Sequence, residues 1–375
     1  MKCRFTIRAD GNLTCARPTW RMRFNRHEIS SGQRRHAGAL QSGEPLNEKT
    51  QITADRQPIR TYIDFEKPIA ELESKVAELQ TLHAAENSVS IAEEISRLKQ
   101  KAHQALVDTY SKLAPWQKTQ VARHPERPHT LDFVNALIAD FTPLAGDRYF
   151  AEDAAIMGGM GTFNDRSVVV IGHEKGSDME SRIRHNFGMA MPEGYRKAIR
   201  LMELAERFDM PVLTLIDTAG AYPGIGAEER GQAEAIARST DVCLGLGVPI
   251  ISVVIGEGGS GGAVAIATAN RILMLEHAIY TVASPEAAAT ILWRDSARAI
   301  DAATNMKITA QDLLALKVID GIIPEPLGGA HRDRDGTIKA TGSAIAKALG
   351  EFDGVTPAQV RRQRQDRFMA IGQAV

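Results

Sequence analysis

The stretch from Pro249 to Ala269 reads PIISVVIGEGGSGGAVAIATA, and its pattern decides the fold. Its first residues are apolar and mostly β-branched, which is typical of a strand buried on both faces. A glycine-rich turn runs from Gly256 to Ala263. The small apolar residues that begin at the end of this turn favour a helix. A strand, a tight turn and a helix in this order predict an α/β domain with a largely parallel sheet.

Further apolar runs extend this pattern in both directions along the chain. The strand candidates are 167–172, 212–216, 249–255, 271–275 and 279–283, and helices are expected near 193–208, 228–244 and 261–269. A second glycine-rich turn, DTAGAYPGIGA from Asp217 to Ala227, follows the strand at 212–216. We expect both turns to lie between a strand and a helix.

Three segments differ in composition. Residues 1–61 form a basic leader, expected to be disordered or absent from the mature protein. Residues 62–121 show apolar residues at helical spacing, interrupted at Asn87-Ser88, and predict a helical hairpin that packs on the body or on a partner. Residues 122–375 form the third segment, in which 122–148 reads as a connector with a short amphipathic piece at 133–141.

Charge and cysteine content exclude several classes of protein. The net charge is −1, with +7 in residues 1–60 and −8 in the remainder, so the acidic body gives little support to nucleic-acid binding. The three cysteines and the scattered histidines show no zinc or disulfide spacing, which favours a metal-free intracellular protein. The uncharged stretch from Val242 to Gly256 is too short to span a bilayer.

The two glycine-rich turns carry the chemistry. A turn at a helix N-terminus aims unsatisfied N–H donors and the positive end of the helix dipole at one point, where a phosphate, a carboxylate or a developing enolate oxygen can bind. A dinucleotide site is one alternative, because Gly256, Gly258 and Gly261 fit GxGxxG and Glu276 follows at the right distance. Glycines that only allow close packing are another. We favour an oxyanion hole, and Ser260 lacks the context of a catalytic nucleophile.

At this point the chain resembles the carboxyltransferase alpha subunits of bacterial and plastid acetyl-CoA carboxylase. The matching runs include FEKPIAELE at 65–73, ARHP at 122–125, LAGDR at 144–148, NFGM at 186–189, PEGYRKA at 192–198, GAEERGQ at 226–232, the turn at 256–263 and IPEPLGGAH at 323–331. Together they cover the chain from about residue 63 onward. The leader has no counterpart.

The resemblance implies a crotonase-like fold of repeated ββα units and an α2β2 complex whose active site lies between an alpha and a beta chain. Carboxybiotin on the biotin carboxyl carrier protein would donate a carboxyl group to acetyl-CoA, giving malonyl-CoA, the first committed step of fatty acid synthesis. ATP would be used by a separate biotin carboxylase, and this chain would bind no metal. A cytoplasmic location is expected, or a plastid one if the leader is a transit peptide.

The resemblance also implies roles for residues of both turns. The N–H groups of Gly261 and Gly262 would bind the biotin oxygen, while Gly258, Gly259 and Ser260 would shape the biotin side. The wall for the acyl substrate would be lined by Gly220, Ala221, Tyr222, Gly224 and Gly226.

Departures from the family pattern leave alternatives open. Ala219 stands where the family has proline, the stretch 176–181 (GSDMES) replaces a more basic one, and Ala287-Ala288 replaces Gly-Cys. A carboxyltransferase for another acyl-CoA, a subunit of a biotin-dependent decarboxylase and a non-catalytic assembly subunit are the other functions that fit this fold.

Overall fold

The computed structural model describes residues 6–7, 13–14, 61–86 and 89–373. The chain divides into two units, 1–58 and 59–375. In the first unit, β1 (Thr6–Ile7) pairs with β2 (Leu13–Thr14) as a short antiparallel ladder. Most of the basic leader and the break at Asn87-Ser88 lie outside the described residues, so the predictions made for them stay predictions.

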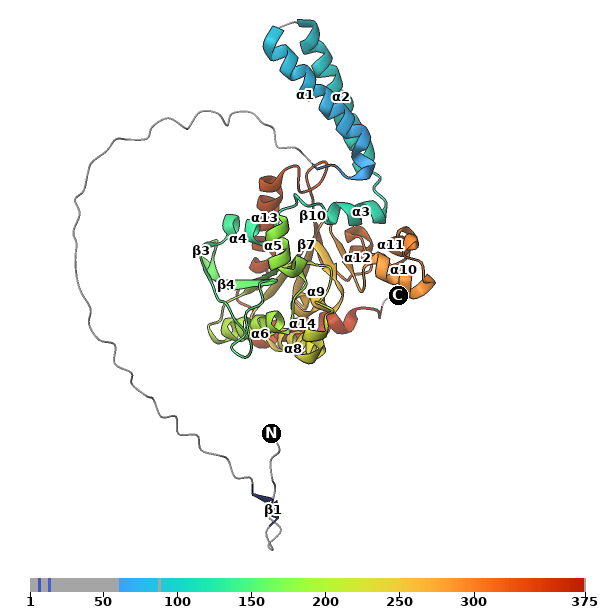
Figure 1. Cartoon of the computed structure of the whole chain (residues 1–375). Helices are drawn as coiled ribbons and strands as arrows, with labels where there is room; N and C mark the ends of the chain where they lie inside the picture. The colour runs from blue at the N-terminus through green and yellow to red at the C-terminus, as the bar shows by residue number, and fades with distance from the viewer. Residues whose placement is uncertain (1–5, 8–12, 15–60, 87–88, 374–375) are drawn as a thin grey trace, which may run out of the picture. The chain divides into compact units, whose positions relative to one another are not determined.

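The second unit is built on an eight-stranded sheet (Figure 1). Its strands are β3 (Ala139–Pro143), β4 (Ile156–Phe163), β5 (Arg166–His173), β6 (Val212–Thr218), β7 (Ile250–Gly259), β8 (Arg271–Leu275), β9 (Ile279–Thr281) and β10 (Gly321–Ile323). The order is β10-β8-β7-β6-β5-β4-β3, and β9 pairs with the end of β7. Strands β5, β6, β7, β8 and β10 run parallel, whereas β3 and β4 form an antiparallel edge.

The five strand candidates are confirmed as β5 to β9, but β3, β4 and β10 were missed. The sequence of β4, IMGGMGTF, has low strand propensity because of its glycines. The glycines are needed for close approach to β3, since a Cβ on Gly159 would lie 2.2 Å from the Thr142 carbonyl oxygen. The expected amphipathic piece at 133–141 was also wrong, because it divides into the end of α4 and the start of β3.

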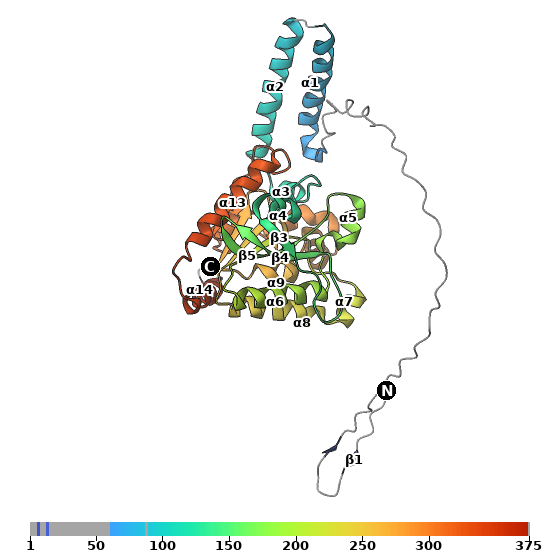
Figure 2. The same ribbon diagram turned by 90° about the vertical axis from the view of Figure 1, so that its left-hand side faces the viewer.

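Helices cover both faces of the sheet. The larger helices of the body are α3 (Pro115–Ala122), α4 (Thr130–Leu137), α6 (Pro192–Arg207), α8 (Gln232–Gly245), α9 (Ser260–Ala267), α10 (Pro285–Trp293), α13 (Arg334–Gly350) and α14 (Pro357–Ala370). The shorter ones are α5 (Met179–Arg184), α7 (Ile225–Glu229), α11 (Ala299–Asn305), α12 (Ala310–Ala315) and the 3-10 turns Asp64–Glu66, Asn186–Gly188 and Ser296–Arg298. Figure 2 shows α6 and α8 side by side below the strands and α3 and α4 above them. The helix expected at 228–244 is divided, because Gly231 has a φ of 79° and separates α7 from α8.

The two expected N-terminal helices are α1 (Lys67–Glu86) and α2 (Val89–Tyr110), which pack against each other. Val76 and Ile95 are buried between them. At the base of the pair, Glu66 accepts a hydrogen bond from the Tyr110 hydroxyl at 2.9 Å and lies 3.4 Å from the Arg332 guanidinium. None of the helices in the described part of the chain combines the length and the apolar character that a membrane span requires.

Candidate active site

The two glycine-rich turns lie against each other at the carboxyl edge of the sheet. Strands β6 and β7 are parallel neighbours, and Thr218 pairs with Gly258 at their ends. A Cβ on Gly259 would lie 2.2 Å from the Ala219 carbonyl oxygen, and one on Gly262 would lie 2.6 Å from the Ala221 nitrogen. Gly259 and Gly262 are therefore glycines because the other turn occupies the space of a side chain. In an open parallel sheet, this edge is where ligands bind.

Helix α9 begins inside the second turn. Gly259 is its N-cap, so Gly261 and Gly262 belong to its first turn, whose N–H groups have no acceptor within the helix. The helix dipole adds a partial positive charge at this end. A Cβ on Gly261 would be 3.4 Å from the nearest atom, a methyl group of Ile236, which is ordinary contact. Packing therefore explains Gly259 and Gly262 but not Gly261.

Ser260 occupies a strand-turn-helix position with a φ of 55°, a left-handed conformation that is costly for a residue with a side chain. The expected position of this turn between a strand and a helix is confirmed. Within the described residues, however, no hydrogen bond joins the Ser260 hydroxyl to a histidine or a carboxylate. The arrangement does not make Ser260 an activated nucleophile.

The first turn is held by its own hydrogen bonds. The Thr218 hydroxyl donates to the Gly220 carbonyl oxygen at 2.7 Å and accepts from the Gly220 N–H at 3.1 Å. The Tyr222 N–H donates to the Ala190 carbonyl oxygen, and the Gln232 amide donates to the same oxygen and to that of Tyr222. Gly220 and Ala221 lie at the contact with α9.

The remaining expected residues of the first turn lie further along the chain. Gly224 is the N-cap of α7, and Gly226 lies within that helix. The Tyr222 ring packs over Gly224, because a Cβ on Gly224 would be 2.3 Å from the ring. These positions continue from the contact with α9 into a partly exposed wall.

Two fully buried polar side chains lie near this edge and were missed by sequence reasoning. His173 is the last residue of β5, and burial lowers its pKa to about 4, so the ring is neutral near pH 7. The Tyr195 hydroxyl is 2.9 Å from the position of a Cβ on Gly262. The Tyr195 hydroxyl has no hydrogen-bond partner within the described residues, and the His173 ring faces the backbone of Gly262. Nothing in their local sequence marks them, because only the fold places them beneath the turns.

A buried charged cluster links the ends of three neighbouring strands. The Lys175 ammonium lies 2.8 Å from Asp217 Oδ1 and 2.8 Å from Glu257 Oε2. Arg123 pairs with Glu257 at 2.6 Å and with Glu286 at 2.5 Å. Asp217 and Glu257 stand in the two quoted turns, but sequence reasoning gave them no role. Their position at strand ends was the available signal.

A second cluster joins residues that are far apart in sequence. The rings of His124 and His331 stack with centroids 3.7 Å apart, and Glu66 lies close enough for the three to hold a metal ion. The surroundings do not suit a cation. His124 Nε2 lies 2.9 Å from the Thr61 carbonyl oxygen and its Nδ1 accepts the Glu126 N–H, while Glu66 is engaged at the hairpin base. We assign the cluster to packing.

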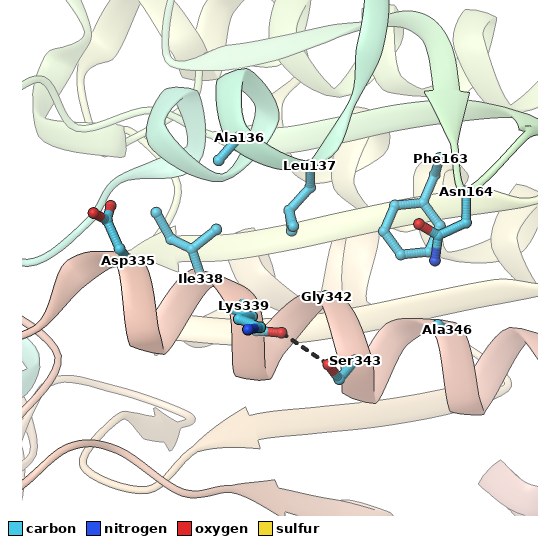
Figure 3. A pocket seen from close by; sticks show the side chains of 10 residues that line it. All are labelled: Ala136, Leu137, Phe163, Asn164, Asp335, Ile338, Lys339, Gly342, Ser343 and Ala346. Carbon is cyan, nitrogen blue, oxygen red and sulfur yellow. Dashed lines mark hydrogen bonds between the residues drawn. The ribbon is translucent and has the colours of Figure 1, made fainter.

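The dinucleotide interpretation is not supported by the site. Glu276 follows β8, and its carboxylate accepts the Glu325 N–H at 3.2 Å. The space beside Gly258 is filled by the Tyr280 ring, 2.7 Å from a Cβ at that position. A cavity of about 550 Å³ lies elsewhere, between α4 and α13 (Figure 3), and its lining includes none of the turn residues.

Comparison with known proteins gives the family. Residues 62–372 match the family model described as acetyl co-enzyme A carboxylase carboxyltransferase-like. An acetyl-coenzyme A carboxylase carboxyl transferase subunit alpha from Beijerinckia indica is 64% identical over 314 residues, which cover 84% of this chain and 99% of that protein. The subunit from Xanthobacter autotrophicus is 64% identical over 317 residues, covering 84% and 100%.

Among solved structures, transcarboxylase 12S with methylmalonyl-coenzyme A and methylmalonic acid bound has a TM-score of 0.50 and 19% identity. The match covers 61% of this chain, which spans only 42% of that one. This likeness supports the expected crotonase-like α/β fold and nothing finer. On the evidence of the family model and the two relatives, the chain belongs to the alpha subunits of acetyl-CoA carboxylase carboxyltransferase, the biotin-dependent transferase that forms malonyl-CoA for fatty acid synthesis and works as a complex with a beta subunit.

Proposed function

We propose that the N–H groups of Gly261 and Gly262 form the oxyanion hole for the ureido oxygen of carboxybiotin. The observation that carries this assignment is the difference between the glycines of the turn. Gly258, Gly259 and Gly262 are each required by a neighbouring atom within 3 Å of a Cβ, whereas Gly261 is not. Gly261 therefore needs another reason to be glycine, and its N–H, like that of Gly262, lies in the first turn of α9, where the helix itself provides no acceptor.

The residues present fit such a ligand. Bound carboxybiotin supplies an activated carboxyl group. The first turn of α9 then stabilises the negative charge that develops on the ureido oxygen when this carboxyl group leaves, and one donor of an oxyanion hole typically contributes about 3 kcal/mol. Because the donors are held by the packing of Gly259 and Gly262 against the other turn, they need no reorganisation during the reaction.

The other expected residues receive roles from their places in the two turns. We assign Gly258, Gly259 and Ser260 to the biotin side of the site. They connect β7 directly to α9 and so lie next to the proposed donors. Gly220, Ala221, Tyr222, Gly224 and Gly226 form the neighbouring wall, on which we place the acyl group of acetyl-CoA or malonyl-CoA.

Exposed apolar side chains flank the site on two sides. Val282 follows β9, which pairs with Gly259, and is 82% exposed, while Ile225 in α7 is 78% exposed. Burying such side chains is favourable by about 2 kcal/mol each. We place the beta subunit over them, in an α2β2 complex that receives the biotin carboxyl carrier protein. ATP is assigned to a separate biotin carboxylase, and the bacterial relatives favour the cytoplasm as the location.

The test is the reverse half-reaction, malonyl-CoA-dependent carboxylation of biocytin, measured with this chain and a beta subunit. Gly261→Pro removes one donor from the first helical turn, although proline also restricts the preceding Ser260, whose φ is 55°, so kcat is measured on the folded variant and should fall by about 10² to 10³. Gly261→Ala keeps the donor and adds a methyl group in ordinary contact, so we expect a loss below about tenfold.

Circular dichroism and the melting temperature establish that both variants fold. A folded Gly261→Pro complex with wild-type kcat would contradict the oxyanion assignment. Absence of activity in the wild-type complex would contradict the substrates, and activity of the alpha chain without the beta subunit would contradict the shared site.

A further inference from the structure

The end of β7 is not a regular continuation of the sheet. Ile216 of β6 pairs with Val254 of β7, but Thr218 pairs with Gly258, so β7 gains two residues relative to β6 over this step. Such a bulge bends the strand and redirects the residues that follow it. Here the residues that follow are the turn and the first N–H groups of α9.

The Asp217 carboxylate holds this bulge. Its Oδ1 accepts the Glu257 backbone N–H at 3.0 Å. The same oxygen fills the place of a side chain on Gly256, because a Cβ there would lie 2.4 Å from it. The path of β7 just before the turn therefore depends on where this one carboxylate lies.

Lys175 fixes that carboxylate from the neighbouring strand. It follows β5 and reaches past β6, so that its ammonium lies 2.8 Å from both Asp217 Oδ1 and Glu257 Oε2. One cation therefore joins the ends of β5, β6 and β7. The two carboxylate side chains are only 5% and 8% exposed, so water cannot take over this role.

We propose that Lys175 is a positioning residue for carboxyl transfer: by holding the Asp217 and Glu257 carboxylates together, it sets the bulge of β7 and so aims the first N–H groups of α9. This inference rests on the oxyanion role given above to Gly261 and Gly262. Lys175 does not itself touch the substrate in this arrangement.

The charges around Lys175 show what its loss would do. Asp217 also faces His129, whose Nδ1 lies 3.3 Å from Oδ2, and the neutral His173, while Glu257 faces Arg123, which is shared with Glu286. Burial acts to raise the pKa of both cluster carboxyls, but the attraction of Lys175, with His129 or Arg123, lowers each below its usual value. Without Lys175 two buried carboxylates would repel each other, and the pKa of one would rise.

The central test compares Lys175→Met, which keeps the length of the side chain and removes its charge, with Lys175→Met/Asp217→Asn, which restores the charge balance. In the biocytin assay with the beta subunit, kcat of Lys175→Met should fall by about 10², the loss that misplaced donors cause, while KM for malonyl-CoA changes less than threefold. Activity of this variant should rise as the pH is lowered, because protonation of one carboxyl relieves the repulsion. The double variant should recover at least tenfold in kcat and lose this pH dependence.

Arg364→Met is the matched control, because Arg364 is a buried cation at the other end of the same sheet. It donates to the carbonyl oxygens of Cys243, Leu246 and Val248 at 2.6 to 2.7 Å, near the start of β7. Its loss should lower the melting temperature and leave kcat of the folded fraction unchanged. If Lys175→Met does not fold, Asp217→Asn is the test variant instead. It weakens the contact with Lys175 and keeps an oxygen that can accept the Glu257 backbone N–H.

Wild-type kcat in folded Lys175→Met, or in folded Asp217→Asn if the first does not fold, overturns the inference. A double variant no better than Lys175→Met at any pH overturns it as well. The two proposals separate cleanly: if Gly261→Pro abolishes turnover while Lys175→Met does not, only the positioning role fails. If Gly261→Pro leaves kcat unchanged, the oxyanion role itself fails.

Discussion

The Tyr195 hydroxyl lies directly behind Gly262, 2.9 Å from the position that a Cβ on Gly262 would occupy. It is fully buried, and within the described residues it has no hydrogen-bond partner. Burial raises the pKa of Tyr195 well above its usual value, so the hydroxyl stays protonated. The first turn of α9 therefore packs against the Tyr195 hydroxyl, a buried polar group that forms no hydrogen bond within the described residues.

Tyr195→Phe should leave the protein as stable as before or stabilise it by about 1 kcal/mol, because a buried hydroxyl without a partner costs free energy. Urea unfolding monitored by circular dichroism measures the change, and kcat should stay within about threefold of wild type because the α9 donors are untouched. A destabilisation above about 1 kcal/mol would show that the hydroxyl has a partner after all.

Gly259→Ala should prevent assembly of the site. The added methyl group would lie 2.2 Å from the Ala219 carbonyl oxygen, which is backbone and cannot swing away. We expect destabilisation of about 3 kcal/mol or more, as overpacking a rigid contact produces, and loss of transferase activity.

The control for Gly259→Ala is Gly245→Ala, at the end of α8, where nothing lies within 4 Å of the new Cβ. It should be neutral or stabilising by up to about 1 kcal/mol. Thermal melting of both variants compares them directly. Equal melting temperatures of Gly259→Ala and Gly245→Ala would contradict the close contact between the backbones of the two turns.

The parallel part of the sheet was predictable because its strands are buried on both faces and read as continuous apolar runs. SVVVIG in β5 and PIISVVI leading into β7 are examples. Strand β4 was not predictable in this way, because Gly159 and Gly161 lower its strand propensity and are explained only by the neighbouring β3. The pattern of apolar residues in a sequence predicts which strands are buried. It does not predict where two backbones approach each other closely.

The residues of the candidate site likewise fall into those that a local sequence signal predicts and those that only the fold brings together. The two turns could be found because glycines between a strand and a helix are a local signal, although packing, and not chemistry, accounts for Gly259 and Gly262. Lys175 and His173 could not be found, because their importance comes from the order β5-β6-β7, which brings distant strand ends together. No spacing in the sequence encodes that adjacency.

Acid should destabilise the protein partly through Glu325. Its carboxylate forms a bidentate pair with Arg127, both contacts at 2.8 Å, and accepts the backbone N–H groups of His277 and Ala330. Burial acts to raise the pKa of Glu325, but Arg127 and these hydrogen bonds lower it to about 2. Since the unfolded value is about 4.3, this stabilisation is fully present above that pH and is lost as the pH falls toward 2.

Glu325→Gln should therefore lower stability at pH 7 by about 3 kcal/mol and flatten the dependence of unfolding free energy on pH between about 4.5 and 2. Chemical denaturation across this range measures both effects. Glu351→Gln is the control. Glu351 pairs with Arg271, but its side chain is 42% exposed, and exposed ion pairs contribute little to the free energy of unfolding. Parallel pH curves for wild type and Glu325→Gln would rule out this source of acid sensitivity.

The attachment of α1 and α2 should depend on Glu66. This carboxylate accepts the Tyr110 hydroxyl at 2.9 Å and the Ile63 N–H at 2.9 Å, and it lies 3.4 Å from Arg332. Glu66→Gln removes its charge without changing its size and should weaken these contacts by about 2 kcal/mol. Because the body has its own apolar core, the loss should appear as local opening of the helix pair.

Hydrogen exchange measured by mass spectrometry tests this prediction, with faster exchange expected in peptides from 61–86 and 89–110 and unchanged exchange in β6 and β7. Glu78→Gln on the exposed face of α1 is the matched control and should change nothing. Faster exchange throughout the body would show that Glu66 supports the whole fold and not the base of the hairpin. Unchanged exchange in both variants would mean that apolar contacts such as that of Ile69 hold the helices without it.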